Sequence, residues 1–189
     1  MSVPEVLERL RDVLQSLGIP YMVTGSFASS AHGEPRATND LDVVIAPTPP
    51  QLEELLSRLP ESQYYSNIQE ARDAFRRRSQ FNVIDFDGMW KIDLIIKKRR
   101  PFSEREFQRR AVVEIAGVLM QTASPEDVLI SKLEWAKLGE TERQLRDAAG
   151  VVRVQREKLD IDYVERSVAA LELDAQWEAA LAMAGLTSR

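Results

Sequence analysis

The sequence predicts an α+β fold, in which a mixed β-sheet with helices is followed by a helical C-terminal part. Short β-branched runs stand between amphipathic segments in residues 1–122, whereas residues 123–189 show only helical patterns. Helices and strands do not alternate regularly, as they would in a doubly wound sheet. We therefore divide the 189 residues into an α/β core, 1–122, and a helical subdomain, 123–189.

The first elements follow from apolar periodicity and from turn residues. The segment PEVLERLRDVLQSLG has apolar residues at helical spacing and stops at Gly18. IPYMVTG predicts a short buried strand ending at Gly25, and SFASSAHG predicts a helix start with Ser26 as its N-cap. NDLDVVIAP is a second predicted strand, stopped by Pro47, and TPPQLEELLSRLP is a helix capped by Thr48.

The remaining elements follow in the same way. SNIQEARDAFRRR predicts a helix, and QFNVIDFDGMWKIDLIIK predicts a hairpin joined at Asp87-Gly88. AVVEIAGVLMQTAS predicts a second hairpin around Gly117. From Ser124 the pattern changes, because SPEDVLISKLEWAKLG begins with a Ser cap and a Pro, ends with a Gly, and is followed by helical segments up to Leu186.

Composition excludes several classes of function. The chain has no Cys, so it forms no disulfide and no zinc–thiolate site, and its single His argues against a His-based metal cage or a Ser-His-Asp triad. No apolar run approaches the ~18 residues of a membrane span, and the acidic, amphipathic N-terminus differs from a secretion signal. We expect a cytoplasmic protein with no membrane segment, in which any metal is a hard cation on carboxylates.

The net charge of −5 hides a basic window. Residues 72–110 hold 12 of the 25 Lys and Arg against six acidic residues, which gives this window a charge of +6. A charge run is usually a solvated face. The alternative is a local site for phosphate groups.

Two carboxylates open the second predicted strand. Because side chains alternate along a strand, Asp40 and Asp42 share one face and their Cα atoms lie roughly 7 Å apart. Neighbouring carboxylates repel one another unless a cation neutralises them, and Mg²⁺ prefers carboxylate oxygen and keeps positions for substrate phosphate. The pattern is therefore compatible with a metal clamp or with ordinary turn chemistry.

A third carboxylate favours the metal interpretation. Asp93 stands inside the apolar strand WKIDLII, where a charge is rarely buried without a partner. If this strand lies beside the strand of Asp40 and Asp42, three carboxylates come together, enough for two Mg²⁺ ions. The alternatives are an edge-strand charge that prevents aggregation, and Asp85 in place of Asp93 if the register shifts by one residue.

The Gly-Ser pair suits a phosphate. A helix N-terminus offers free N–H groups and the positive end of the helix dipole. Gly25 would let the backbone approach closely, and the Ser26 hydroxyl could donate to a phosphate oxygen. The Walker A pattern is absent, so this is no P-loop.

These motifs resemble those of a known superfamily. GSFASSAHGEPRATNDLDVVI resembles the first motif of the nucleotidyltransferases related to polymerase beta, and KIDLI is similar to the second. LISKLEWA and LRDAAG resemble the later Lys and Asp motifs of AbiEii-like, stand-alone toxin nucleotidyltransferases. The resemblance runs from about Tyr21 to Gly150 and implies a mixed-sheet nucleotidyltransferase core.

The resemblance also implies roles for single residues. It makes three carboxylates the Mg²⁺ ligands, namely Asp40, Asp42 and Asp93, and it makes Gly25 and Ser26 the triphosphate binders. Two later residues gain catalytic roles from it, Lys132 at the nucleotide phosphates and Asp147 as a candidate base. Two loop residues are implied to brace the nucleotide site, Arg36 and Thr38. Without the resemblance, Lys132 would be either a cleft or a snorkelling surface lysine, and Asp147 a solvent-facing helix residue.

The expected function is Mg²⁺-dependent transfer of an NMP group from an NTP to a hydroxyl acceptor. The basic window favours an RNA acceptor, tRNA-like, and the resemblance favours a toxin-like role with an antitoxin partner. Two alternatives stay open: modification of a small molecule such as an antibiotic, and a catalytically inactive nucleotide-binding module.

Overall fold

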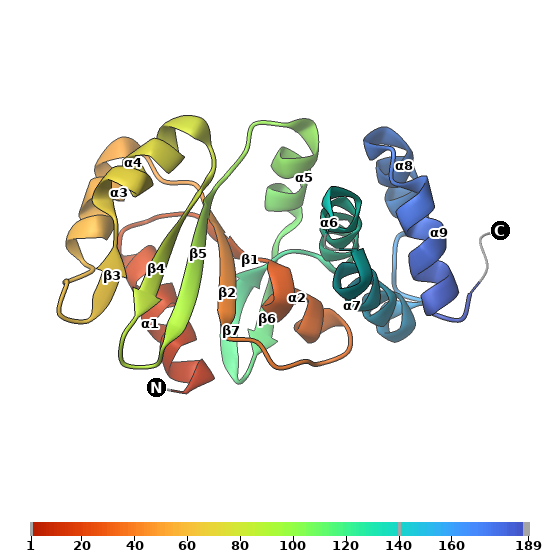
Figure 1. Cartoon of the computed structure of the whole chain (residues 1–189), viewed down its shortest axis with the longest axis horizontal. Helices are drawn as coiled ribbons and strands as arrows, with labels where there is room; N and C mark the ends of the chain where they lie inside the picture. The colour runs from red at the N-terminus through yellow and green to blue at the C-terminus, as the bar shows by residue number, and fades with distance from the viewer. Residues whose placement is uncertain (1, 140, 187–189) are drawn as a thin grey trace. The chain divides into compact units, whose positions relative to one another are not determined.

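In the computed structural model, residues 2–139 and 141–186 are described, and the strands among them form one mixed seven-stranded sheet (Figure 1). The α+β fold class predicted from the sequence is confirmed. The strand order is β3-β4-β5-β2-β1-β7-β6. The strands are β1 Tyr21–Val23, β2 Asp40–Ile45, β3 Tyr64–Ser66, β4 Gln80–Asp85, β5 Trp90–Ile96, β6 Ala111–Ile115 and β7 Val118–Thr122.

The sheet is mixed because two of its six strand pairs run parallel. β2 pairs parallel with β5, and β1 pairs parallel with β7. The other four pairs, β1–β2, β3–β4, β4–β5 and β6–β7, are antiparallel. Leu41, Val43 and Ile45 are completely buried in β2, so the apolar face of this strand anchors the middle of the sheet.

The contacts divide the chain into two compact units. The first comprises residues 1–24 and 38–122, and the second comprises residues 25–37 and 123–189. The sequence analysis also placed a boundary after residue 122, but it assigned residues 25–37 to the core. This segment instead groups with the C-terminal helices, because its helix packs on two of them.

The first unit contains the sheet and four helices. These are α1 Val3–Ser16, α3 Pro49–Ser57, α4 Ile68–Arg77 and α5 Pro101–Arg109. Capping explains the start of α3, since Thr48 and Gln51 form a capping box and Pro occupies the first turn. Side chains of α1 and α3 line a small cavity with Val83, Ile92 and Leu94, so these two helices cover one face of β4 and β5.

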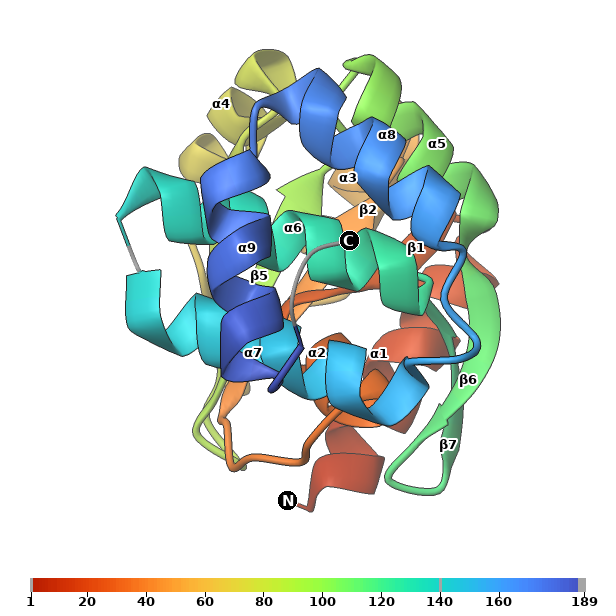
Figure 2. The same cartoon turned by 90° about the vertical axis from the view of Figure 1, so that its right-hand side faces the viewer.

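The second unit is a group of helices, seen in Figure 2 from the side. Its helices are α2 Gly25–His32, α6 Pro125–Leu138, α7 Thr141–Gln155, α8 Ile161–Leu171 and α9 Asp174–Met183. Ser124 caps α6 by accepting from the Asp127 N–H at 3.2 Å. Its core is built from small and branched side chains such as Leu129, Ala148 and Val164, each fully buried. None of the described helices is long and apolar enough to cross a membrane.

Both hairpins predicted from the sequence are present, but their turns differ. Ala116 and Gly117, both at positive φ, connect β6 and β7 directly, as a tight two-residue turn requires. Four residues separate β4 from β5, and there Met89, not Gly88, adopts the left-handed conformation, with φ 52°. The sequence analysis did not predict β3, which has three residues, or α5, which has nine.

Candidate functional site

The first unit carries the three candidate carboxylates on adjacent parallel strands. Asp42 on β2 is in register with Asp93 on β5, and Asp40 is in register with Lys91. Residues in register on neighbouring strands point to the same face, so Asp40, Asp42 and Asp93 share one face of the sheet. Leu41 and Ile92 occupy the opposite face, which α1 and α3 help to cover.

Asp93 is the most buried of these carboxylates, and its two oxygens differ. Oδ2 accepts a hydrogen bond from Lys91 Nζ at 2.9 Å, while Oδ1 is buried and has no hydrogen-bond partner. A buried carboxylate oxygen without a partner is costly. The oxygen-rich donor set and this buried Oδ1 fit a hard divalent cation. Among the residues described, no three side chains of the metal-binding types already stand close enough to hold one.

The Lys91 ammonium is bound to Asp93 and is influenced by the negative charges of the other two carboxylates. Its pKa is raised above the usual value, chiefly by the hydrogen bond to Asp93 and further by the negative charges of Asp40 and Asp42. The Lys91 side chain is 44% exposed. The sequence analysis gave this lysine no role at the site, although its spacing two residues before Asp93 places both side chains on one face of the strand.

Asp85, the alternative carboxylate in the sequence analysis, faces the other side of the sheet. It is in register with Trp90 and shares its face with Val83, a residue of the cavity under α1 and α3. Asp85 is fully buried, lies 3.5 Å from Arg9 Nη1 and accepts from the Gly88 N–H at 3.0 Å. These contacts fix the β4–β5 turn, so Asp85 has a structural role.

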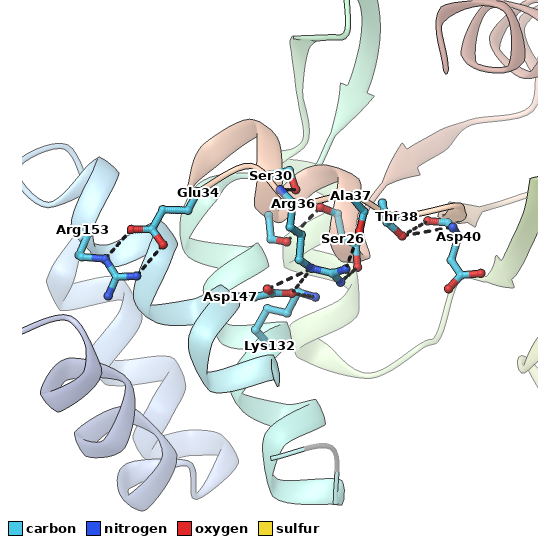
Figure 3. A network of polar contacts seen from close by, with 11 residues as sticks. Ser26, Ser30, Glu34, Arg36, Ala37, Thr38, Asp40, Lys132, Asp147 and Arg153 are labelled. Carbon is cyan, nitrogen blue, oxygen red and sulfur yellow. Dashed lines mark hydrogen bonds and ion pairs between the residues drawn. The ribbon is translucent and has the colours of Figure 1, made fainter. Parts of the chain in front are cut away.

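Four more of the predicted site residues form a connected network of polar contacts in the second unit (Figure 3). They are Ser26, Arg36, Lys132 and Asp147. The Arg36 guanidinium donates from Nε to both oxygens of Asp147, at 3.2 and 3.3 Å, and from Nη2 to the Ser26 hydroxyl. Lys132 Nζ donates to Asp147 Oδ2 at 2.8 Å. One carboxylate therefore binds two cations, and one of these cations also holds the Ser26 hydroxyl at the start of α2.

Burial makes this network different from a surface ion pair. The Lys132 and Asp147 side chains are only 5% and 7% exposed, and that of Arg36 is 29% exposed. The interpretations from residue pattern alone, a snorkelling Lys132 and a solvent-facing Asp147, are therefore wrong. Each buried charge has an opposite charge within hydrogen-bond distance, as burial requires.

Glycines set the local geometry of this network. Gly25 begins α2 at φ 63°, a left-handed conformation that glycine adopts without strain. A Cβ on Gly33 would come within 2.8 Å of the Val151 N and 2.9 Å of the Gly150 carbonyl carbon. Only glycine permits this close approach, which brings the segment after α2 against α7. Gly150 lies one turn beyond Asp147, so the LRDAAG motif supplies both the carboxylate and the contact.

Thr38 and His32 have structural partners. The Thr38 hydroxyl accepts from the Asp40 N–H at 3.2 Å and so fixes the start of β2 (Figure 3). The His32 ring nitrogen Nε2 lies 2.8 Å from the Ala123 carbonyl oxygen, a distance at which it donates a hydrogen bond. Burial lowers the pKa of His32, since the charged ring loses hydration.

Within the basic window, Lys91 is bound to Asp93, and the cluster 97–100 follows the end of β5. The Lys97 N–H donates to the Ile45 carbonyl, so the cluster 97–100 stands where β2 and β5 end, whereas Asp40 and Asp42 stand in the first half of β2 and Asp93 stands at the middle of β5. Lys97 follows Asp93 by four residues, or about 13 Å of strand. Several cations of the window are bound internally, with Arg72 to Glu53, Arg76 to Asp73, Lys97 to Glu104 and Arg78 to the Lys97 carbonyl. Lys98 and Arg99 are exposed.

Comparison with known proteins gives structural neighbours only. No family model matches the sequence, and no curated protein sequence matches it. Among solved structures, ANT(2'')-Ia in complex with adenylyl-2''-tobramycin has a TM-score of 0.62 at 13% identity, covering 90% of this chain and 97% of that one. An antigenic nucleotidyltransferase-like protein from Paracoccidioides brasiliensis has a TM-score of 0.57 at 17% identity, covering 98% and 94%. The lincosamide antibiotic adenylyltransferase LnuA, lincomycin-bound, has a TM-score of 0.54 at 11% identity, covering 77% and 93%.

These neighbours are nucleotidyltransferases or are described as nucleotidyltransferase-like, and most of each chain superposes on this one. The likeness shows that the chain has the nucleotidyltransferase fold, as the sequence resemblance implied. At 11–17% identity it shows the fold alone.

Proposed function

We propose that this protein is a divalent-metal-dependent nucleotidyltransferase, which moves an NMP group from an NTP to a hydroxyl group. The observation that carries the proposal is the register of Asp42 beside Asp93, with Asp40 on the same face and a buried, unpartnered oxygen on Asp93. A fold of this class with oxygen donors placed in this way suits phosphoryl chemistry.

The three carboxylates Asp40, Asp42 and Asp93 would hold the metal, with Mg²⁺ as the expected ion. Bound there, Mg²⁺ supplies charge neutralisation for the triphosphate and lowers the pKa of the acceptor hydroxyl. The protein's part is to hold carboxylate oxygens on one face of two hydrogen-bonded strands, where the rigid sheet fixes their spacing.

Lys132, Arg36 and Ser26 would bind the phosphate groups. Lys132 and Arg36 both pair with Asp147, so two cationic side chains stand together in this network. Ser26 offers a hydroxyl, and Gly25 a backbone in the left-handed conformation, at the start of α2. A polyphosphate is the anion that such donors suit.

The geometry changes the expected role of Asp147. A general base needs a lone pair free to accept the proton of the acceptor hydroxyl. Both Asp147 oxygens already accept from Lys132 or Arg36. We therefore assign Asp147 to positioning these two cations, and the base role implied by the resemblance is not retained in the proposal.

For the acceptor, the observations favour a small hydroxylated compound over RNA. The basic cluster 97–100 stands at the far ends of β2 and β5 from the carboxylates, and part of the basic window is paired with acidic side chains. Two of the structural neighbours are an antibiotic-resistance factor bound to adenylyl-tobramycin and an adenylyltransferase bound to lincomycin. The exposed Lys98 and Arg99 keep RNA as the second candidate.

A panel of acceptors tests the proposal. The protein is incubated with Mg²⁺ and each α-labelled NTP in turn, against total RNA and against a set of aminoglycoside and lincosamide compounds. Label on a small compound, unchanged after Lys98→Ser with Arg99→Ser, supports the proposal. Label on RNA, reduced by the same double substitution, moves the assignment to RNA. No label on any acceptor, together with NTP binding, indicates the inactive module. The toxin-like role, the antitoxin partner and cytoplasmic location stay predictions.

A further inference from the structure

Lys91 on β5 is a lysine placed among the three candidate metal-binding carboxylates. It stands in the parallel pair that carries all three candidate ligands, in register with Asp40 and two residues before Asp93. Its Nζ donates to Asp93 Oδ2 at 2.9 Å. A positive charge thus already lies on the buried carboxylate that the proposed function assigns to the metal.

Two charges of the same sign do not bind at one carboxylate without cost. A divalent ion that ligates Asp93 meets the Lys91 ammonium within a few ångströms, and their repulsion weakens both interactions. Asp93 Oδ1, which has no hydrogen-bond partner, gives such an ion a first point of contact. The Lys91 side chain is 44% exposed, so it has open solvent into which it can swing.

We propose that Lys91 is an internal counterion of the metal site, which holds Asp93 in the metal-free protein and is displaced when a divalent cation binds. This inference rests on the proposed function. It assigns to Lys91 a positioning role, since the lysine acts through Asp93, and it makes Lys91 the residue that sets the metal concentration at which the site fills.

Binding of Mn²⁺ alone, measured by calorimetry and by electron paramagnetic resonance, tests the proposal without turnover. Lys91→Met removes the competing charge and should tighten Mn²⁺ binding by about two- to fivefold, the size expected for loss of one partly exposed ion pair. Lys91→Arg keeps the charge and should bind Mn²⁺ as the unmodified protein does. Should Lys91→Met fail to fold, Lys91→Gln makes the same test.

Lys98→Met is the matched control, because Lys98 is an exposed lysine just after the same strand. It changes the net charge equally, so it reports any general electrostatic effect and should alter Mn²⁺ affinity by less than about twofold. A second readout is the melting temperature. Lys91→Met leaves Asp93 without its cation in metal-free buffer, so it should show a larger rise in melting temperature on addition of Mn²⁺ than the unmodified protein does.

Asp93→Asn separates the failure of this inference from the failure of the proposed function. Where Asp93→Asn abolishes Mn²⁺ binding and Lys91→Met leaves it unchanged or weaker, Lys91 is no counterion to the metal and the inference falls alone. Where Mn²⁺ binding is the same with and without Asp93, the metal site itself is wrong and both proposals fall. Tighter binding in Lys91→Met but not in Lys98→Met supports the inference.

Discussion

The carboxylates of the sheet and the cations of the helices balance their charges in opposite ways. In the first unit the negative charges of three aspartates raise the pKa of one lysine, Lys91. In the second unit one aspartate, Asp147, forms ion pairs with a lysine and an arginine. Acidic side chains thus outnumber Lys91 in the first set, and basic side chains outnumber Asp147 in the second. By composition, the aspartates on the sheet suit a cation, and the lysine and arginine on the helices suit an anion.

Burial differs between the two sets as well. Asp40 is exposed and Asp42 is intermediate, so most of the charge on the sheet stays hydrated. Lys132 and Asp147 are almost completely buried. Buried ion pairs have to be formed for the fold to be stable, while exposed carboxylates contribute little to it. Substitutions in the two units should therefore separate activity from stability.

The largest expected effect is on activity in the first unit. Asp40→Asn removes a metal ligand and one repelling charge, so we expect transfer to fall by about a thousandfold or more. The melting temperature of the metal-free protein should stay the same or rise. Activity assays with calorimetry measure both. The control is Glu114→Gln, an exposed carboxylate on β6. A clearly lower melting temperature for Asp40→Asn would instead mean that Asp40 fixes the strand start.

In the second unit we expect stability and nucleotide binding to change together. Asp147→Asn leaves Lys132 and Arg36 without their shared negative charge, which should cost about 3–5 kcal/mol of unfolding free energy. The KM for the NTP should rise, while the pH–rate profile keeps its shape. Denaturant unfolding and steady-state kinetics check this. A loss of the acidic limb of the profile, with KM unchanged, would restore the base role of Asp147.

The smallest expected effect concerns pH. Burial lowers the folded-state pKa of His32 below its ordinary value of 6.5, so the unfolded chain binds the proton more readily. Its contribution to stability is thus complete above about pH 6.5 and is lost as the pH falls toward the folded-state pKa. His32 is the only histidine, so the decrease in melting temperature between pH 7.5 and 5.5 should be smaller in His32→Gln. An equal decrease in both proteins would contradict this.

Local patterns sufficed for much of the fold and for part of the site. Strand alternation placed Asp40 and Asp42 on one face, and the turn and cap residues located both hairpins and most helices. Pattern alone left open whether Asp85 or Asp93 joins them. That choice depends on which face of the sheet α1 and α3 cover, and this is a tertiary property.

The rest of the candidate site depends on contacts between distant parts of the sequence. Arg36 and Asp147 are separated by 111 positions, and nothing near either residue indicates that they meet. The close approach of Gly33 to Gly150 also joins distant segments, since Gly33 alone resembles an ordinary helix end and Gly150 lies inside a helix. Helical periodicity placed Asp147 toward solvent because it reports one helix at a time and not the arginine that covers it.

Transfer of label from two differently labelled nucleotides tests the central claim most directly. The protein is incubated with Mg²⁺, the acceptor panel and an NTP labelled at either the α- or the γ-phosphate, in parallel with its Asp42→Asn variant. The proposed reaction predicts that an acceptor gains the α-label only, that the γ-label leaves as pyrophosphate, and that Asp42→Asn abolishes both. Transfer of the γ-label to an acceptor, or full α-label transfer by Asp42→Asn, would contradict the assignment of a nucleotidyltransferase that uses the carboxylates of β2 and β5.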